Sequence, residues 1–158
     1  MKISRIVAID PDVTKSGVAE IDTENRNVTV KAMTFPELID HINGIENKES
    51  VRIAVEAGWL NKPNWHFAKS IAIAGSIGND VGRNHETGRK IVEMCEHVGF
   101  SVSLVRPLKK RGTGVGGKVT HSEVQNALRQ LRMSLAKKRT NQDERDSILI
   151  AIEEYKRL

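Results

Sequence analysis

The stretch ISRIVAIDPDVTKSGVAEIDTENRNVTVKAM, residues 3–33, contains three short segments with the pattern of β-strands. Residues 3–10 include a continuous apolar run and end at Asp10, where the next residue, a proline, stops the strand. Residues 17–22 and 27–33 alternate apolar and polar side chains, and polar turns separate the three segments. Three strands in close succession predict an antiparallel meander.

The remaining sequence alternates between helical and strand patterns. The residues Thr34-Phe35-Pro36-Glu37 have capping-box spacing with an early proline, which predicts the start of a helix. The predicted elements after the meander are a helix over 34–47, a strand over 51–56, a helix over 81–98, a strand over 100–105, and helices over 122–136 and 142–156. The order βββαβαβα predicts an α/β fold with a five-stranded mixed sheet that is flanked by helices on both faces.

Length and composition fit one soluble domain over residues 1–158. Hydrophobic residues make up 39% of the 158, which is enough for a core, and no apolar run approaches the roughly 20 residues of a membrane span. The lone Cys95 excludes an intramolecular disulfide and a zinc site built from cysteines. We expect a cytoplasmic protein with no membrane partner.

The positive charge is concentrated in one segment. The net charge is +5, and residues 101–139 carry ten basic side chains against one acid, Glu123. Such a segment attracts a polyanion, of which nucleic acid is the most common in a cytoplasm. The alternative interpretation is a solvated face that serves only solubility.

Four carboxylates occupy positions that suit a metal site. Asp10 and Glu56 end predicted strands, while Asp143 and Asp146 are three residues apart and share one face of the last helix. Several carboxylates that converge require a cation, and hard oxygen ligands select Mg²⁺ or Mn²⁺. Two such ions promote phosphodiester hydrolysis. Taken singly, each acid also fits a turn former or a residue that answers the helix dipole.

Three motifs together resemble the RuvC-type Holliday junction resolvases, which are ribonuclease-H-like nucleases. The motifs are IVAIDPDVTKSGVAEID, VRIAVEAGW and NQDERDSILIAI, and the order of elements also matches. The resemblance implies a ribonuclease-H-like fold in which Asp10, Glu56, Asp143 and Asp146 are catalytic acids that bind two Mg²⁺ ions, with Mn²⁺ as a substitute. It also implies that Trp59 stacks on junction DNA.

The same resemblance implies a function and its partners. We expect an endodeoxyribonuclease that cuts branched DNA, such as a four-way junction, as a homodimer, in recombination and repair, and without a small-molecule cofactor. The expected phosphate contacts are Lys109, Lys110, Arg111, Lys118 and Arg139. The alignment with the family is loose near the penultimate helix, so either Lys118 or His121 fits one of its phosphate-contacting positions. We favour Lys118. Asp12 occupies a position where the family usually has glycine. It is either an additional acid at the periphery of the metal site or a turn residue.

Other interpretations use the same residues. The chain is either a nuclease for DNA, a nuclease for RNA or RNA–DNA hybrid, or a nucleic-acid-binding module without cleavage. Residues 112–119, GTGVGGKV, nearly match a nucleotide-phosphate loop, but Val119 replaces the required Ser or Thr, so a flexible DNA-facing loop is favoured. Trp65 and Phe67 are either a second stacking pair or a cover for the edge of the core.

Overall fold

The computed structural model describes residues 2–61, 71–109 and 111–158. Its strands and helices are β1 (Arg5–Asp10), β2 (Ser16–Asp22), β3 (Asn27–Met33), α1 (Phe35–Asn43), β4 (Val51–Glu56), α2 (Ile71–His97), β5 (Ser101–Val105), α3 (His121–Gln130), β6 (Ser134–Leu135) and α4 (Gln142–Tyr155). Short 3₁₀ turns cover Lys48–Ser50, Gly58–Leu60 and Val115–Gly117. Among the described helices, none combines the length and the apolar character that a membrane span requires.

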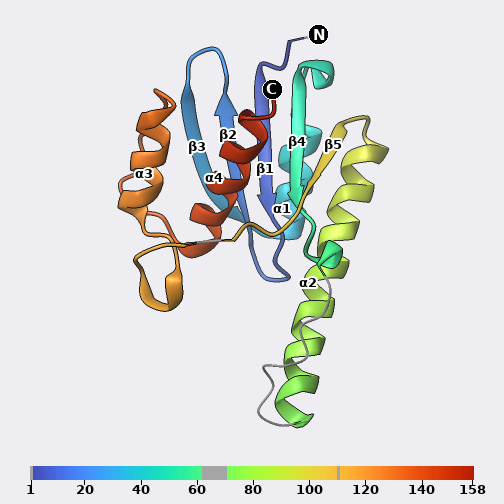
Figure 1. Cartoon of the computed structure of the whole chain (residues 1–158). Helices are drawn as coiled ribbons and strands as arrows, with labels where there is room; N and C mark the ends of the chain where they lie inside the picture. Colours follow the sequence, from blue (N-terminus) through green and yellow to red (C-terminus); the bar gives the residue numbers. More distant parts are fainter. Residues whose placement is uncertain (1, 62–70, 110) are drawn as a thin grey trace.

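The strands form one mixed sheet in the order β5-β4-β1-β2-β3-β6 (Figure 1). The β1–β2 and β2–β3 pairs are antiparallel, which confirms the predicted meander. The β1–β4, β4–β5 and β3–β6 pairs are parallel. β1 therefore lies in the middle of the sheet, between an antiparallel and a parallel neighbour.

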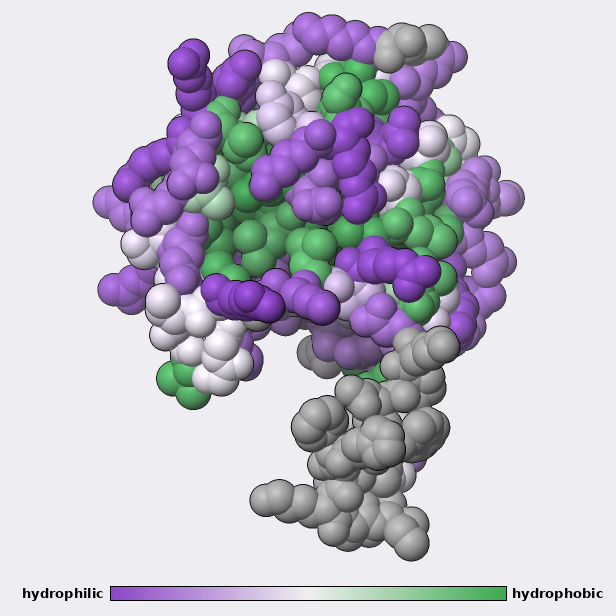
Figure 2. Space-filling model, in the orientation of Figure 1, coloured by the Kyte–Doolittle hydropathy of each residue, from purple (hydrophilic) through white to green (hydrophobic). Residues whose placement is uncertain are grey.

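Helices cover both faces of the sheet, as predicted. Ile6 and Ala8 of β1 belong to a core that α3 and α4 cover, whereas Val7 and Ile9 belong to a second core beneath α1 and α2. This alternation follows from the two-residue period of a strand, and burial on both faces explains the continuous apolar run of β1. Figure 2 shows the α3–α4 side, where hydrophobic surface is bordered by hydrophilic residues.

The sheet has a sixth strand that the sequence did not predict, and α3 ends at Gln130 rather than near residue 136. Arg132 adopts a left-handed conformation (φ 57°), and the Met133 N–H donates to the Leu128 carbonyl at 2.9 Å. These are the features of a Schellman C-cap, which turns the chain out of the helix. The residues that follow then pair as β6 with β3.

Candidate active site

Asp10 and Glu56 lie side by side at one end of the sheet. β1 and β4 are parallel, and the last pair in their register is Ile9 with Val55, so the next residues are Asp10 and Glu56. Ala8 and Ala54, two residues earlier, belong to the core beneath α3 and α4, so the period of the strands directs both acids to that face. Both acids also line a pocket of about 200 Å³.

Gly17 brings the start of α4 to the same corner. It pairs with Asp10 across the β1–β2 ladder, and a Cβ atom on Gly17 would lie 2.0 Å from the Asp143 carbonyl oxygen. Only the absence of a side chain allows this approach of two backbones. Asp143 is consequently held beside the strand position that faces Asp10.

The first turn of α4 is fixed by its own hydrogen bonds. The side chain of Asn141 accepts from the Glu144 N–H at 2.8 Å, and the Glu144 carboxylate accepts from the Asn141 N–H at 3.1 Å. This capping box satisfies donors that a helix start leaves unpaired. Lys137 forms an ion pair with the nearly buried Glu144, which ties the incoming segment to the helix.

Asp146 is a buried acid on the same helix. Its side chain is only 7% exposed, and Oδ1 accepts a hydrogen bond from Gln142 Nε2 at 2.8 Å. Burial of a carboxylate is costly unless hydrogen bonds or a cation compensate its charge. Asp143, one turn earlier on the same face, is half-buried.

The backbone thus holds Asp10 and Glu56 side by side and brings that of Asp143 to the same corner, while Asp146 follows one turn later on α4. Within the described part of the chain, however, no three His, Cys, Asp or Glu side chains form a group that could hold a metal ion. Carboxylates that share a corner repel one another unless a cation lies between them. The donor set itself, four hard oxygen ligands, suits Mg²⁺ or Mn²⁺. The metal site stays a prediction.

Asp12 serves the turn between β1 and β2. Its Oδ1 accepts from the Thr14 N–H at 2.7 Å, the pattern of an Asx turn, and its Oδ2 accepts from Asn84 of α2 at 3.4 Å. The backbone N–H of Val13 donates to Asn84 Oδ1 at 3.2 Å. Of the two roles open to Asp12, these contacts favour the turn residue.

Trp59 is half-buried and lines the same pocket as Asp10 and Glu56. Its ring meets His85 edge-on, with centroids 6.4 Å apart, and the Arg89 guanidinium lies 5.4 Å from the ring centroid. A Cβ on Gly88 would lie 2.6 Å from the ring, so the indole packs directly on the backbone of α2. These contacts of Trp59 therefore help to fix the position of α2 beside the pocket.

The expected phosphate contacts are exposed where the structure describes them: Lys109, Arg111, Lys118 and Arg139. Lys110, Trp65 and Phe67 lie outside the described residues. His121 begins α3, and its Nδ1 lies 2.8 Å from Thr140 Oγ1, just before the cap of α4. Exposure leaves Lys118 available to a phosphate, whereas His121 is engaged between two segments of the protein.

Three pocket or corner residues were not singled out from the sequence: Asn84, His85 and Gln142. Burial, with a smaller contribution from Arg89, lowers the pKa of His85, so its ring is neutral at pH 7. Gln142 is one turn before Asp146, a spacing that could have identified it. Burial raises the pKa of Cys95 to about 12, so its thiol offers no nucleophile.

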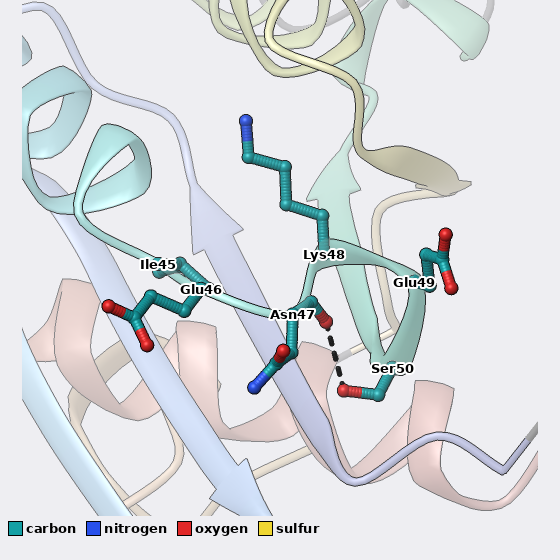
Figure 3. A pocket seen from close by; sticks show the side chains of 6 residues that line it. All are labelled: Ile45, Glu46, Asn47, Lys48, Glu49 and Ser50. Carbon is teal, nitrogen blue, oxygen red and sulfur yellow. Dashed lines mark hydrogen bonds between the residues drawn. The ribbon is translucent and has the colours of Figure 1, made fainter.

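A second pocket, of about 750 Å³, lies at the opposite end of β4 and is lined by residues 45–50 (Figure 3). Its lining comes from a single turn, in which Ser50 Oγ donates to the Asn47 carbonyl at 2.9 Å. Lys48 points away from the rest of the turn and donates to the Val98 carbonyl. None of the candidate acids is in this pocket.

Comparison with known proteins identifies the fold. No protein-family model matches the chain, and no curated protein matches it either. Among solved structures, Thermus thermophilus RuvC aligns with a TM-score of 0.52 and 16% identity over 97% of this chain and 95% of its own. T. thermophilus RuvC in complex with a Holliday junction substrate aligns with a TM-score of 0.49 and 15% identity over 97% and 94% of the two chains. The structural resemblance expected from the sequence is therefore confirmed: the chain has the ribonuclease-H-like α/β fold of RuvC, with six strands in place of the predicted five.

Proposed function

We propose that this protein is an endonuclease of the RuvC type that depends on Mg²⁺ and hydrolyses phosphodiesters in branched DNA, with the four-way junction as its substrate. The observation that carries the proposal is the corner where Asp10 and Glu56 end neighbouring parallel strands and α4 presses against Gly17. A nuclease of this class needs carboxylates from separate elements at one rigid point, and a sheet end provides it.

In this proposal Asp10 and Glu56 would hold the ions from the sheet, while Asp143 and Asp146 would hold them from α4. Two Mg²⁺ ions, or Mn²⁺ as a substitute, supply activation of the attacking water and stabilisation of the leaving oxygen when bound. The protein's own contribution is placement: Gly17 sets the distance between α4 and β1, and Gln142 orients the Asp146 carboxylate.

The DNA arms would contact the basic segment, and two copies of the chain would act together. Lys109, Lys110, Arg111, Lys118 and Arg139 are the proposed phosphate contacts. A homodimer matches the two-fold symmetry of a four-way junction, because a dyad presents two sites to two strands.

The experiment that tests the function compares four substrates: a four-way junction, duplex DNA, single-stranded DNA and an RNA–DNA hybrid, each with Mg²⁺ or with EDTA. We expect cleavage of the junction alone, only with the metal. Preferred cleavage of the RNA–DNA hybrid would favour the alternative function, a nuclease that acts on RNA or RNA–DNA hybrid. Junction binding without cleavage under any metal would identify a binding module.

Binding should depend strongly on salt, because each neutralised phosphate releases condensed counterions, with a log–log slope near −0.9 per contact for duplex arms. Replacing Lys109, Lys110 and Arg111 with alanine should flatten this slope in a fluorescence titration. An unchanged slope would mean that the basic segment serves only solubility and does not contact DNA. The exposed Lys2, at the opposite end of β1 from Asp10, gives a matched control as Lys2→Ala.

Trp59→Ala should weaken binding to a junction more than to a plain duplex, since only a branch offers an unpaired base face, worth roughly 1–3 kcal/mol when stacked. The melting temperature should also fall, because the ring packs on Gly88. Trp59→Phe should retain part of the preference for the junction and part of the thermal stability. Equal losses on the two DNAs would mean that the indole serves only to seat α2.

A further inference from the structure

Val115 is an apolar residue whose side chain is almost fully exposed to solvent. It is 94% exposed, the largest exposed fraction among the large hydrophobic side chains that the structure describes. It sits at the end of the glycine-rich loop 112–118, which projects at the lower left of Figure 1. The lobe at that place in Figure 2 is pale and ends in hydrophobic surface.

The loop around Val115 is closed by its own backbone. The Gly112 N–H donates to the Gly117 carbonyl at 2.9 Å, and the Gly114 N–H donates to the Lys118 carbonyl at 2.9 Å. Gly116 and Gly117 have φ values of 67° and 75°, which favour glycine. A Cβ on Gly112 would lie 2.1 Å from the Lys118 carbonyl oxygen. The glycines therefore build a tight turn rather than a loose tether.

A contact with α3 fixes the direction of this turn. The Thr113 N–H donates to the Glu123 carboxylate at 3.0 Å, and the same carboxylate accepts from the Thr120 N–H at 2.7 Å in the capping box of α3. Glu123 is the only acid among residues 101–139, and it is engaged in these bonds. An apolar side chain is thus presented at the end of an anchored loop.

The surroundings of Val115 select a polyanion as the occupant. Arg111 and Lys118, on the two sides of the turn, are both exposed. A protein partner that bound through one valine would gain little apolar contact, whereas a nucleic acid offers phosphates to the cations and base faces to the valine. In Figure 1 the loop projects at the same end of the molecule as the end of β1 that carries Asp10.

We infer that Val115 is a wedge that enters an opened base step at the branch point while Arg111 and Lys118 hold the flanking phosphates. Apolar wedges of this kind partly unstack a base step, and the cost is least where pairing is already interrupted. Val115 would then contribute to the choice of branched over continuous DNA. The inference rests on the proposed function, since it names how that site's substrate is recognised.

The test uses the full chain in EDTA and a junction with 2-aminopurine beside the branch point, whose fluorescence rises on unstacking. Wild type should raise the signal. Val115→Ser should reduce that rise and weaken junction binding about tenfold, with duplex binding changed by less than about twofold. Val115→Ile should retain both properties. The matched control is Leu158→Ser, which alters a 57% exposed side chain at the C-terminal end of the chain and should match wild type.

Each outcome separates the wedge from the nuclease. A Val115→Ser variant that binds and unstacks the junction like wild type would overturn the wedge, even if Mg²⁺-dependent cleavage is established. A wild-type protein that unstacks the junction through Val115 but never cleaves it would retain the wedge and refute the nuclease. Failure of wild type to prefer the junction over duplex would overturn both.

Discussion

Asp146→Asn is expected to lower Mg²⁺-dependent cleavage of a four-way junction by orders of magnitude while the fold is retained. Asparagine keeps an oxygen that can accept the hydrogen bond from Gln142 Nε2 and has nearly the same volume. It lacks the negative charge that a divalent cation needs from its ligands. Loss of that charge weakens the activation of water and the stabilisation of the leaving oxygen together.

The stability of the variant separates a metal ligand from a structural acid. If Asp146 belongs to a cluster of acids, removal of one charge relieves repulsion, and the melting temperature in EDTA should hold or rise slightly. The helix dipole is a weak alternative, because Asp146 lies beyond the first turn of α4, where the acidic residues are Asp143 and Glu144. Junction binding in EDTA should persist, since the basic segment carries it.

A matched control is Asp40→Asn, which removes one negative charge from an exposed residue of α1, away from the corner. It should leave both cleavage and binding at the wild-type level. Melting temperature, binding in EDTA and cleavage in Mg²⁺ are measured on one preparation of each variant. Full cleavage by Asp146→Asn would remove Asp146 from the site and seriously weaken the resolvase proposal.

The sequence predicted those elements whose signals are local. The apolar run of β1 and the alternation of β2 and β3 marked the meander, and the Thr34–Glu37 capping box marked the start of α1. Gly99 marked the end of α2: its φ is 95°, and the Phe100 N–H donates to the Cys95 carbonyl. In each case a short sequence carries the physical cause of the element.

The predictions failed where a distant part of the chain decides the structure. Arg132 follows α3 in the left-handed conformation, where glycine is usual. Because no glycine is present there, the sequence carried no signal for the turn. β6 has only two residues, too few for an alternating pattern, and exists because β3 offers an edge. α2 begins at Ile71 rather than near residue 81, because a stretch that contains Gly75 and Gly78 masks helical periodicity.

The candidate site shows the same division. The acids were predicted from motif and spacing, since Asp10 and Glu56 end strands, and Asp143 and Asp146 lie in the first two turns of a helix, that are readable in the sequence. Gly17 was read only as the start of a strand, and its close approach to Asp143 depends on how α4 docks. His85 lies far along the chain from Asp10, and only the packing of α2 brings it to the pocket.

Gly17→Ala is expected to damage stability and cleavage together, because the added Cβ would lie 2.0 Å from the Asp143 carbonyl oxygen and 2.5 Å from its carbon. Both neighbours are backbone atoms, so no side-chain rotation relieves the clash, and α4 has to move away from β2. Overpacking of this kind costs typically 1–3 kcal/mol of unfolding free energy. A displacement of about 1 Å at a catalytic group can cost roughly 100-fold in rate.

The matched control for this substitution is Gly44→Ala, at the end of α1. Its Cβ would meet the nearest atoms at 3.5 Å, an ordinary contact, and its φ of −76° suits alanine. We expect wild-type melting and cleavage from this control. Gly17→Ala should melt at a lower temperature, require more Mg²⁺ for half-maximal cleavage, and still bind the junction in EDTA, because the basic segment does not depend on the gap between β2 and α4. Wild-type melting and a wild-type Mg²⁺ requirement would show that α4 does not sit on β2 at Gly17, and the four acids would then have no common corner.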